Sequence, residues 1–354
     1  VEEACGVGEA QMYKVAEMFA KNRPSTIVWC MGQTQHTIGN AMVRASCILQ
    51  LALGNIGVSG GGANIFRGHD NVQGATDVGP NPDSLPGYYG VAEGSWKHWC
   101  RVWGVDYEYI KSRYAEGMTT KAGMTVSRWV DGVLENPELI DQKSGNLRGL
   151  FFWGHAPNSQ TRGLDMKKAM DKLDLLVVVD PYPSATASMA AMPGDPAGLN
   201  PNREVYLLPA ATQFECAGSC TASNRSLQWR EKVIEPMFDS RTDHMIMQQL
   251  AEKLGFADEF SRSFTLVKGK GGMMEPEMES VSKEINRGTW TIGYTGQSPE
   301  RLKLHMKNMH TFNVRTLKAE GGTCDGDDFG LTWPCYCTAD IKHTGAPTLY
   351  SPEQ

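Results

Sequence analysis

Apolar positions at helical spacing, followed by a short apolar run, open the chain. Residues 9–20 place Met12 and Val15 on one helical face, and the sequence NRP ends that helix before the apolar run STIVWCMG, which predicts a buried strand. The polar loop QTQHTIG starts after Gly32, and helical spacing then returns until Gly54. This order predicts an α/β unit whose polar loop lies at the carboxyl end of a strand, the edge where open α/β sheets bind ligands.

The same order returns in the second half of the chain. LRGLFFWG at 148–154 predicts a buried strand, TRGLDMKKAMDKL a helix, and DLLVVVDPYPSATA a second strand with its exit loop. REVYLLPAAT predicts a further strand, and RTDHMIMQQLAEKLG predicts a helix that ends at Gly255. Between the two units Trp96, Trp99 and Trp103 recur at helical spacing, a stripe more typical of a helix core than of a stacking platform.

From about residue 256 onward the pattern loosens. KGKGGMMEPEMES is rich in Gly, Lys and Met, and its GKGG lacks the Ser or Thr that follows GK in a phosphate-binding loop, so we predict a surface loop. The expected fold class is α/β. The expected domains are the end of one α/β domain at 1–68, a second α/β domain at 69–255 with an aromatic-rich helical segment at about 90–145, and an irregular connector at 256–354.

Composition and charge narrow the class of protein. The chain has 354 residues, of which 41% are hydrophobic, enough for the cores of two or three domains. The formal net charge is -6 and Lys and Arg are scattered, so no electrostatic footprint supports nucleic-acid binding. No apolar run approaches the ~20 residues that span a bilayer.

Nine cysteines occur at irregular positions, and the close pairs are Cys216 with Cys220 and Cys335 with Cys337. Neither spacing is typical of a zinc or iron–sulfur site, so we predict thiols packed as small apolar groups. No pair of histidines has the spacing of a metal site, and no metal ligand is assigned.

One arginine stands among glycines in residues 60–79, GGGANIFRGHDNVQGATDVG. On local sequence alone, an ion pair between Arg67 and Asp70 or Asp77 is the favoured interpretation. The surrounding glycines favour a second interpretation, in which Arg67 binds a ligand. Without side chains they let the backbone approach the ligand while the guanidinium projects into the space. A planar, permanently charged fork facing a cavity suits a small carboxylate or another oxyanion.

A second candidate lies at the ends of two predicted strands. Gly154 ends one strand and Asp180 ends the next, a spacing similar to that of dinucleotide-binding folds, where an acidic residue bonds the nucleoside. The chain has one glycine there and no GxGxxG, so a capping or solvated Asp180 is equally consistent with the spacing. His155 and His36 are more typical of loop residues that hydrogen-bond than of metal ligands.

Longer strings resemble a known family. RGHDNVQGATDVG, with QLALGNIGVSGGGANIF and MGQTQHTIGN before it, resembles the catalytic (alpha) subunit of formate dehydrogenases in the molybdopterin oxidoreductase family. GHAPNSQT, VVVDPYPSATA and LLPAATQFECAGSCTASNRSLQWR resemble the second pterin-binding half of the same family. The resemblance covers about residues 10 to 255, and more loosely DIKHTGAPTLY near the end. It implies Rossmann-like three-layer units and the reversible two-electron oxidation of formate to carbon dioxide.

The resemblance also assigns roles to residues. Arg67 matches the arginine that binds the carboxylate of formate beside a molybdenum or tungsten ion held by two molybdopterin guanine dinucleotides. His69, where some relatives carry glutamine, is expected to support the site without touching formate. Residues 32–37 resemble part of one pterin cradle, and His155 and Asp180 resemble the pyrophosphate and guanine ends of the other. The residues expected to contact the cofactor are Gly32, Gln33, Thr34, Gln35, His36, Gly68, Gly154, His155, Asn158, Asp180, Ser184, Thr186 and Thr212.

Some parts of the family pattern have no match here. None of Cys5, Cys30 and Cys47 is followed by histidine, as the family's metal-ligating cysteine or selenocysteine is. We therefore expect a central fragment of a larger subunit, inactive alone, whose [4Fe–4S] cluster motif and closing C-terminal domain lie elsewhere in that subunit.

The resemblance implies partners and a setting. An iron–sulfur electron-transfer subunit and a membrane cytochrome subunit are the expected partners, in electron transport of anaerobic respiration. The expected location is the periplasm, membrane-associated through these partners, with the cytoplasm as the alternative. Two other functions stay open: a relative that acts on a nitrate-type oxyanion, and a non-catalytic electron-transfer scaffold.

Overall fold

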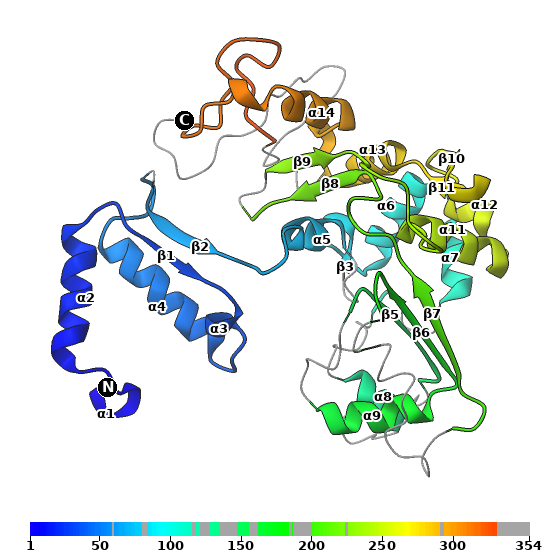
Figure 1. Cartoon of the computed structure of the whole chain (residues 1–354), viewed down its shortest axis with the longest axis horizontal. Coiled ribbons are helices and arrows are strands. Elements are labelled where there is room, and N and C mark those ends of the chain that lie inside the picture. The colour runs from blue at the N-terminus through cyan, green and yellow to red at the C-terminus, as the bar shows by residue number, and fades with distance from the viewer. Residues whose placement is uncertain are drawn as a thin grey trace.

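A computed structural model gives the arrangement of most of the chain. The residues that it describes are 1–58, 60–79, 84–114, 118–120, 128–134, 147–155, 162–183, 186, 200–223, 226–290 and 294–330. Figure 1 shows a small N-terminal unit on one side and the remaining elements on the other, joined by the segment between β2 and α5.

The N-terminal unit contains the helix, strand and helix that the apolar spacing predicts. Its elements are α1 (Glu2–Cys5), α2 (Glu9–Lys21), β1 (Thr26–Trp29), α3 (Met31–Thr34), α4 (Gly39–Ala52) and β2 (Gly62–Ile65). β1 and β2 pair in parallel, with Thr26 opposite Gly62. Gln50, which is fully buried on α4, donates to the carbonyl of Ser25 at 2.9 Å and accepts from Asn55 at 3.0 Å, so it ties the helix to the start of the strand.

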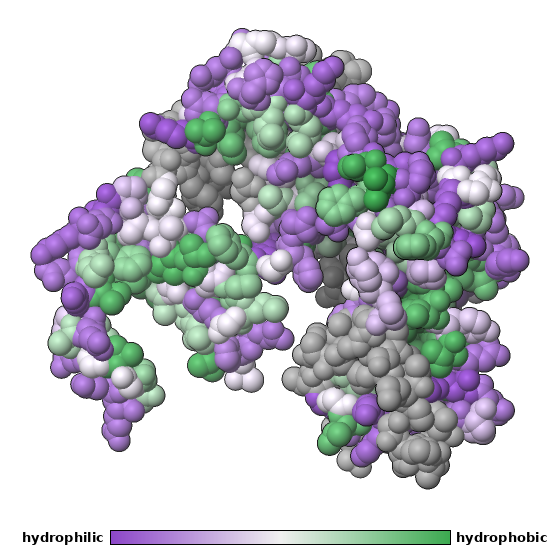
Figure 2. Space-filling model, in the orientation of Figure 1, coloured by the Kyte–Doolittle hydropathy of each residue, from purple (hydrophilic) through white to green (hydrophobic). Residues whose placement is uncertain are grey.

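This unit exposes many of its apolar side chains. Hydrophobic residues gather over β1, β2 and α4 on the face seen in Figure 2. Val28 in β1 is 48% exposed, and Ile48 and Leu51 in α4 are 61% and 62% exposed. A parallel sheet is ordinarily covered on both faces, and in the described part of the chain α4 packs against β1 and β2.

A helical segment follows the N-terminal unit. Its elements are α5 (Val72–Val78), β3 (Ser84–Leu85), η1 (Pro86–Tyr88), β4 (Tyr89–Gly90), α6 (Glu93–Trp103) and α7 (Tyr107–Arg113). Trp96 and Trp99 on α6 are buried together with Leu85 and Tyr107. The tryptophan stripe is therefore a helix core, as its spacing predicts.

The second α/β unit has the expected three layers. Its parallel sheet runs in the order β5 (Gly149–Trp153), β6 (Leu175–Asp180) and β7 (Glu204–Pro209). α8 (Trp129–Leu134) and α9 (Gly163–Lys172) pack on one face, and α11 (Asp243–Leu254) packs on the other. The pattern of β6 explains this: Leu176 and Val178 join the core under α9, while Val177 and Val179 join the core under α11.

Short regular elements also occupy much of residues 257–311, within the region that the sequence predicts to be irregular. They are α12 (Ala257–Phe260), β10 (Leu266–Lys268), η3 (Lys270–Gly272), β11 (Met274–Pro276), α13 (Met278–Gly288), η5 (Tyr294–Gly296), α14 (Pro299–Lys307) and η6 (Met309–Thr311). The predicted surface loop KGKGGMMEPEMES is largely a hairpin, in which β10 and β11 pair antiparallel and Gly271 and Gly272 turn with φ of 65° and 76°. Strands of three residues are too short for alternation to reveal them. An antiparallel pair, β8 (Gly218–Thr221) and β9 (Leu227–Arg230), precedes this region.

None of the helices in the described part of the chain combines the length and the apolar character that crossing a bilayer requires.

Candidate substrate and cofactor site

Arg67 lies two residues beyond the carboxyl end of β2 and is partly buried. Its Nη1 donates to Oε1 of Gln73 at 2.5 Å, and its remaining N–H groups form no hydrogen bond within the described residues. The ion pair with Asp70 or Asp77 that the local sequence favours does not form among these residues, because Gln73 lies between the guanidinium and Asp77. One edge of the guanidinium is therefore left for a ligand.

The two residues after Arg67 leave space beside it. Gly68 has φ of 92°, and a Cβ added there would meet no atom within 4 Å. His69 is exposed, and its ring has no hydrogen-bond partner among the described residues. The supporting role expected for His69 stays a prediction.

The first expected cradle lies at the carboxyl end of β1. Met31–Thr34 form the helical turn α3, where the sequence predicts the end of the strand and the start of the polar loop. Gln33 explains the turn: its Nε2 donates to the carbonyl of Met42 at 3.0 Å and to Oγ of Ser46 at 2.6 Å. The amide nitrogen of Gln33 thus holds this turn against α4, and both of its hydrogen bonds are made within the protein.

The other members of this cradle point outward. His36 Nε2 lies 2.9 Å from the carbonyl oxygen of Gly32, and both residues are exposed, as are Thr34 and Gln35. A Cβ at Gly32 would meet nothing within 4 Å. Open space at a glycine beside exposed polar groups fits a bulky polar ligand at this edge.

The second expected cradle lies at the carboxyl edge of the three-layer unit. Gly154 follows β5 with φ of 57°, its N–H donates to the carbonyl of Val179 at 2.9 Å, and a Cβ there would meet no atom within 4 Å. His155 follows it, and its buried Nε2 has no hydrogen-bond partner among the described residues. The fully buried Thr186 donates to the carbonyl of His155 at 3.0 Å and so holds the backbone at His155. An unpaired buried ring nitrogen next to open space fits a phosphate-bearing ligand.

Asp180 and Thr212 each serve the local fold. Asp180 ends β6 at the same edge as Gly154, and its Oδ1 accepts from the backbone N–H of Tyr182 at 3.0 Å, which is the capping role that the spacing left open. Thr212 donates to Oε2 of Glu215 from its N–H at 2.6 Å and from its hydroxyl at 2.9 Å. Asn158 and Ser184 lie outside the described residues.

Glu215 is a buried residue that sequence reasoning missed. It is 2% exposed, and its Oε1 accepts from the N–H of Met237 at 2.6 Å. Burial by itself would raise the pKa of Glu215, but the donors from Thr212 and Met237 outweigh burial and lower that pKa below its ordinary value. The negative carboxylate therefore holds together the loop after β7 at the edge of the candidate site.

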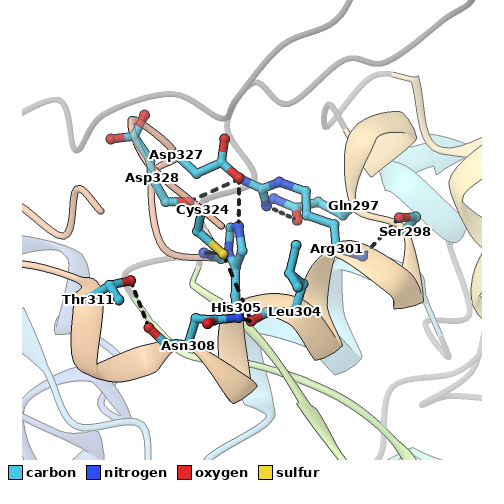
Figure 3. Close-up of polar contacts among 11 residues, drawn as sticks. Gln297, Ser298, Arg301, Leu304, His305, Asn308, Thr311, Cys324, Asp327 and Asp328 are labelled. Atoms are coloured by element: carbon cyan, nitrogen blue, oxygen red, sulfur yellow. Dashed lines mark hydrogen bonds and ion pairs between the residues drawn. The ribbon is translucent and has the colours of Figure 1, made fainter. Parts of the chain in front are cut away.

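A second polar cluster, also missed, joins His305 on α14 to Cys324 and Asp327 (Figure 3). Their ligand-type atoms all lie within 4.8 Å of one another. The hydrogen bonds favour a structural role: the N–H of Gly330 donates to His305 Nδ1 at 3.1 Å, so the ring proton is on Nε2, which lies 3.1 Å from Asp327 Oδ2. A metal would need the lone pair of Nε2, and burial raises the pKa of the Cys324 thiol.

The sequence and structure of the chain were compared with those of known proteins. The model of the molybdopterin oxidoreductase family matches residues 10–253. The chain belongs to this family. It is 28% identical over 98% of its length to the F420-dependent formate dehydrogenase subunit alpha of Methanocaldococcus jannaschii, and covers 40% of that protein. It is 34% identical over 67% of its length to the formate dehydrogenase 2 subunit alpha (cytochrome c-553) of Nitratidesulfovibrio vulgaris, and covers 26% of it.

A solved structure also matches. The chain shares a TM-score of 0.47 and 16% sequence identity with acetylene hydratase from Pelobacter acetylenicus, over 85% of this chain and 37% of that one. The resemblance to formate dehydrogenase alpha subunits is confirmed by the sequence relatives, and the chain spans 40% or less of the length of the two described above. Family membership implies a molybdopterin cofactor, and the open glycines and the unpaired His155 nitrogen fit such a group.

Proposed function

We propose that the chain is the part of a formate dehydrogenase catalytic subunit that binds formate and cradles the pterin cofactor. The reaction is the reversible oxidation of formate to carbon dioxide, with release of one proton and two electrons. The observation that carries the proposal is the guanidinium of Arg67, held on Nη1 by Gln73 with its other donors facing no hydrogen-bonding group of the described chain. The names of the two formate dehydrogenase relatives support formate as the substrate.

Arg67 would act by binding and orientation. The Nε–H and Nη2–H groups lie on one edge of a guanidinium and match the two oxygens of a carboxylate, so bidentate binding there directs the C–H of formate away from the arginine. Fixing that direction lowers the entropy cost of the reaction, and the positive charge stabilises the anion in the site. When bound, the metal centre supplies the two-electron acceptor.

The chain's remaining residues would hold the cofactor. Gly32 and Gly154 leave room at the carboxyl ends of β1 and β5, and His155 Nε2 would gain a partner by bonding a phosphate oxygen. We propose that the cofactor is a bis-(molybdopterin guanine dinucleotide) of molybdenum or tungsten, with each guanosine resting on one α/β unit. Metal and pterin analysis of the intact subunit identifies both.

Substitution of Arg67 tests the substrate. In the intact, cofactor-loaded subunit, Arg67→Lys is expected to lower kcat/KM for formate by roughly a hundredfold or more, because a point charge cannot replace a bidentate fork. Arg44→Lys is the matched control, since Arg44 lies exposed on α4 of the same unit. Metal and pterin content is measured for each variant, so that loss of cofactor is separated from loss of formate binding.

Three results would contradict the proposal. Unchanged formate kinetics in Arg67→Lys would show that Arg67 has a structural role and does not bind formate. A wild-type subunit that turns over nitrate and leaves formate untouched would assign the site to a different oxyanion, since a guanidinium binds either planar anion. A subunit free of metal and pterin would favour the scaffold interpretation.

We further propose that the chain alone is inactive and works within a larger assembly. It spans 40% and 26% of the two formate dehydrogenase relatives, so much of such a subunit lies outside the matched region. An iron–sulfur electron-transfer subunit, a [4Fe–4S] cluster in the catalytic subunit and a membrane cytochrome subunit would carry the electrons away, with the complex on the periplasmic side. Copurification with the tagged catalytic subunit, followed by fractionation of the cell, tests the partners and the location.

A further inference from the structure

A buried hydrogen-bonded chain connects Arg67 to the interior. Gln73, which is 4% exposed on α5, accepts from Arg67 Nη1 at 2.5 Å and donates from Nε2 to Oδ1 of Asp77 at 2.8 Å. Asp77 is fully buried one helical turn further along α5. The guanidinium and the carboxylate are therefore joined through one side-chain amide.

The carboxylate of Asp77 decides which way that amide points. An ionised carboxylate only accepts hydrogen bonds, so the Gln73 amide must turn its NH₂ group toward Asp77. The oxygen of the same amide then faces the opposite way, toward Arg67. The NH₂ group also lies 3.3 Å from the hydroxyl of Tyr88, which accepts from it.

Two tyrosines hold Asp77 in place. The hydroxyl of Tyr88 donates to Oδ1 at 2.7 Å, and the hydroxyl of Tyr294 donates to Oδ2 at 2.6 Å. Tyr294 is 3% exposed and belongs to η5, in a core cluster with Leu227 and Trp229. Each oxygen of the carboxylate therefore accepts a tyrosine hydroxyl, one from the buried Tyr294 and one from Tyr88, whose side chain is partly exposed.

We propose that Asp77, acting through Gln73, positions Arg67 so that its Nε/Nη2 edge receives both oxygens of the substrate carboxylate. This inference rests on the proposed function, since the substrate is taken to be formate. The hydrogen bond from Nη1 to Gln73 restrains rotation of the guanidinium about Cδ–Nε. The Nε/Nη2 edge of Arg67 therefore keeps one orientation. Asp77 and Gln73 are positioning residues, and Arg67 is the group that touches substrate.

The test uses formate kinetics of the intact, cofactor-loaded subunit. Gln73→Met keeps the length of the side chain, the carboxylate of Asp77 and both tyrosine hydroxyls, but it removes the acceptor for Nη1. We expect the KM for formate to rise about tenfold while kcat changes by less than about threefold, because the loosened guanidinium binds ground state and transition state less well to a similar degree. A loss of folded protein lowers the apparent kcat and leaves KM unchanged, so KM separates positioning from folding.

Asp77→Asn provides an independent variant. Asparagine can present its own NH₂ group to the amide of Gln73, which removes the constraint on the direction of that amide, and we expect a KM increase similar to that of Gln73→Met. Asp70→Asn is the matched control: Asp70 is exposed just before α5, and its carboxylate accepts a weak hydrogen bond from the thiol of Cys220 at 3.8 Å. Its formate KM is expected to equal that of the wild type.

A second readout does not depend on turnover. Broadening of the ¹³C-formate NMR signal reports formate binding directly, and the apparent formate Kd is expected to rise about tenfold in Gln73→Met. A wild-type subunit that neither binds nor oxidises formate would overturn the proposed function. Wild-type activity, a large effect of Arg67→Lys and a formate KM within twofold of wild type in Gln73→Met would overturn the positioning role alone.

Discussion

Acidification is expected to destabilise the fold through His305. This ring is 1% exposed, and the rings of Phe312 and Phe329 lie with their centroids 5.0 Å and 6.1 Å away. Burial is the main cause that lowers the pKa of His305 from 6.5 to about 4, and the charge of Arg301 lowers it further, while Asp327 opposes the shift. The folded protein therefore keeps this histidine neutral at a pH where the unfolded chain protonates it.

The size of the effect follows from that difference. Well above pH 6.5, for example at pH 7.5, neither state is appreciably protonated and the contribution of the neutral ring is fully present. As the pH falls toward 4, His305 becomes protonated in the unfolded state and stays mostly neutral in the folded state. Relative to its value at neutral pH, the free energy of unfolding therefore drops by about 2 kcal/mol at pH 5 and by about 3 kcal/mol at pH 4.

Urea unfolding at pH 7.5 and pH 5, followed by tryptophan fluorescence, measures this loss. His305→Gln is the control, because its amide can still donate to Asp327 but does not titrate. Other groups also titrate in this range, and they contribute equally to both proteins. The wild type should therefore lose about 2 kcal/mol more than the variant between the two pH values. Parallel losses in the two proteins would refute the assignment of the acid sensitivity to His305.

Three further predictions concern packing and capping. Gly288→Ala should destabilise the protein by about 1–3 kcal/mol in chemical denaturation, because the new Cβ would overlap the buried ring of Trp99. Gly94→Ala, where a Cβ meets no atom within 4 Å, should change stability by less than about 1 kcal/mol, and an equal loss in both variants would contradict the packing argument. Thr242→Ala should cost about 1 kcal/mol, because Thr242 caps α11 at the N–H of Met245; retained stability would show that water replaces the cap.

The second α/β unit was predictable because its signals are local. The strand at β6 is a continuous apolar run, α9 repeats its apolar residues every three to four positions, and Gly255 ends α11 in the left-handed conformation with φ of 79°. The carboxyl ends of parallel strands meet at one edge, so the placing of Gly154 near Asp180 also follows from the sequence.

The surroundings of Arg67 were only partly predictable. The glycines predict open space near Arg67, and the structure has such space at Gly68. Which side chain bonds the guanidinium depends on distances between residues, and the local sequence does not contain them. Gln73 and Asp77 are four positions apart, which places them on one helix face, yet the hydroxyl that completes the network comes from Tyr294. The cluster of His305, Cys324 and Asp327 was missed for the same reason, since its members come from separate elements.

The contact between Tyr294 and Asp77 joins residues that are 217 positions apart in the chain. The family model ends at residue 253, well before Tyr294. A version of the protein trimmed to the boundaries of that model would keep Arg67, Gln73 and Asp77, yet it would lose the tyrosine hydroxyl that donates to Asp77. The hydrogen bonds that hold Asp77, and with them the orientation proposed for Arg67, therefore depend on a residue beyond the region that the family model matches.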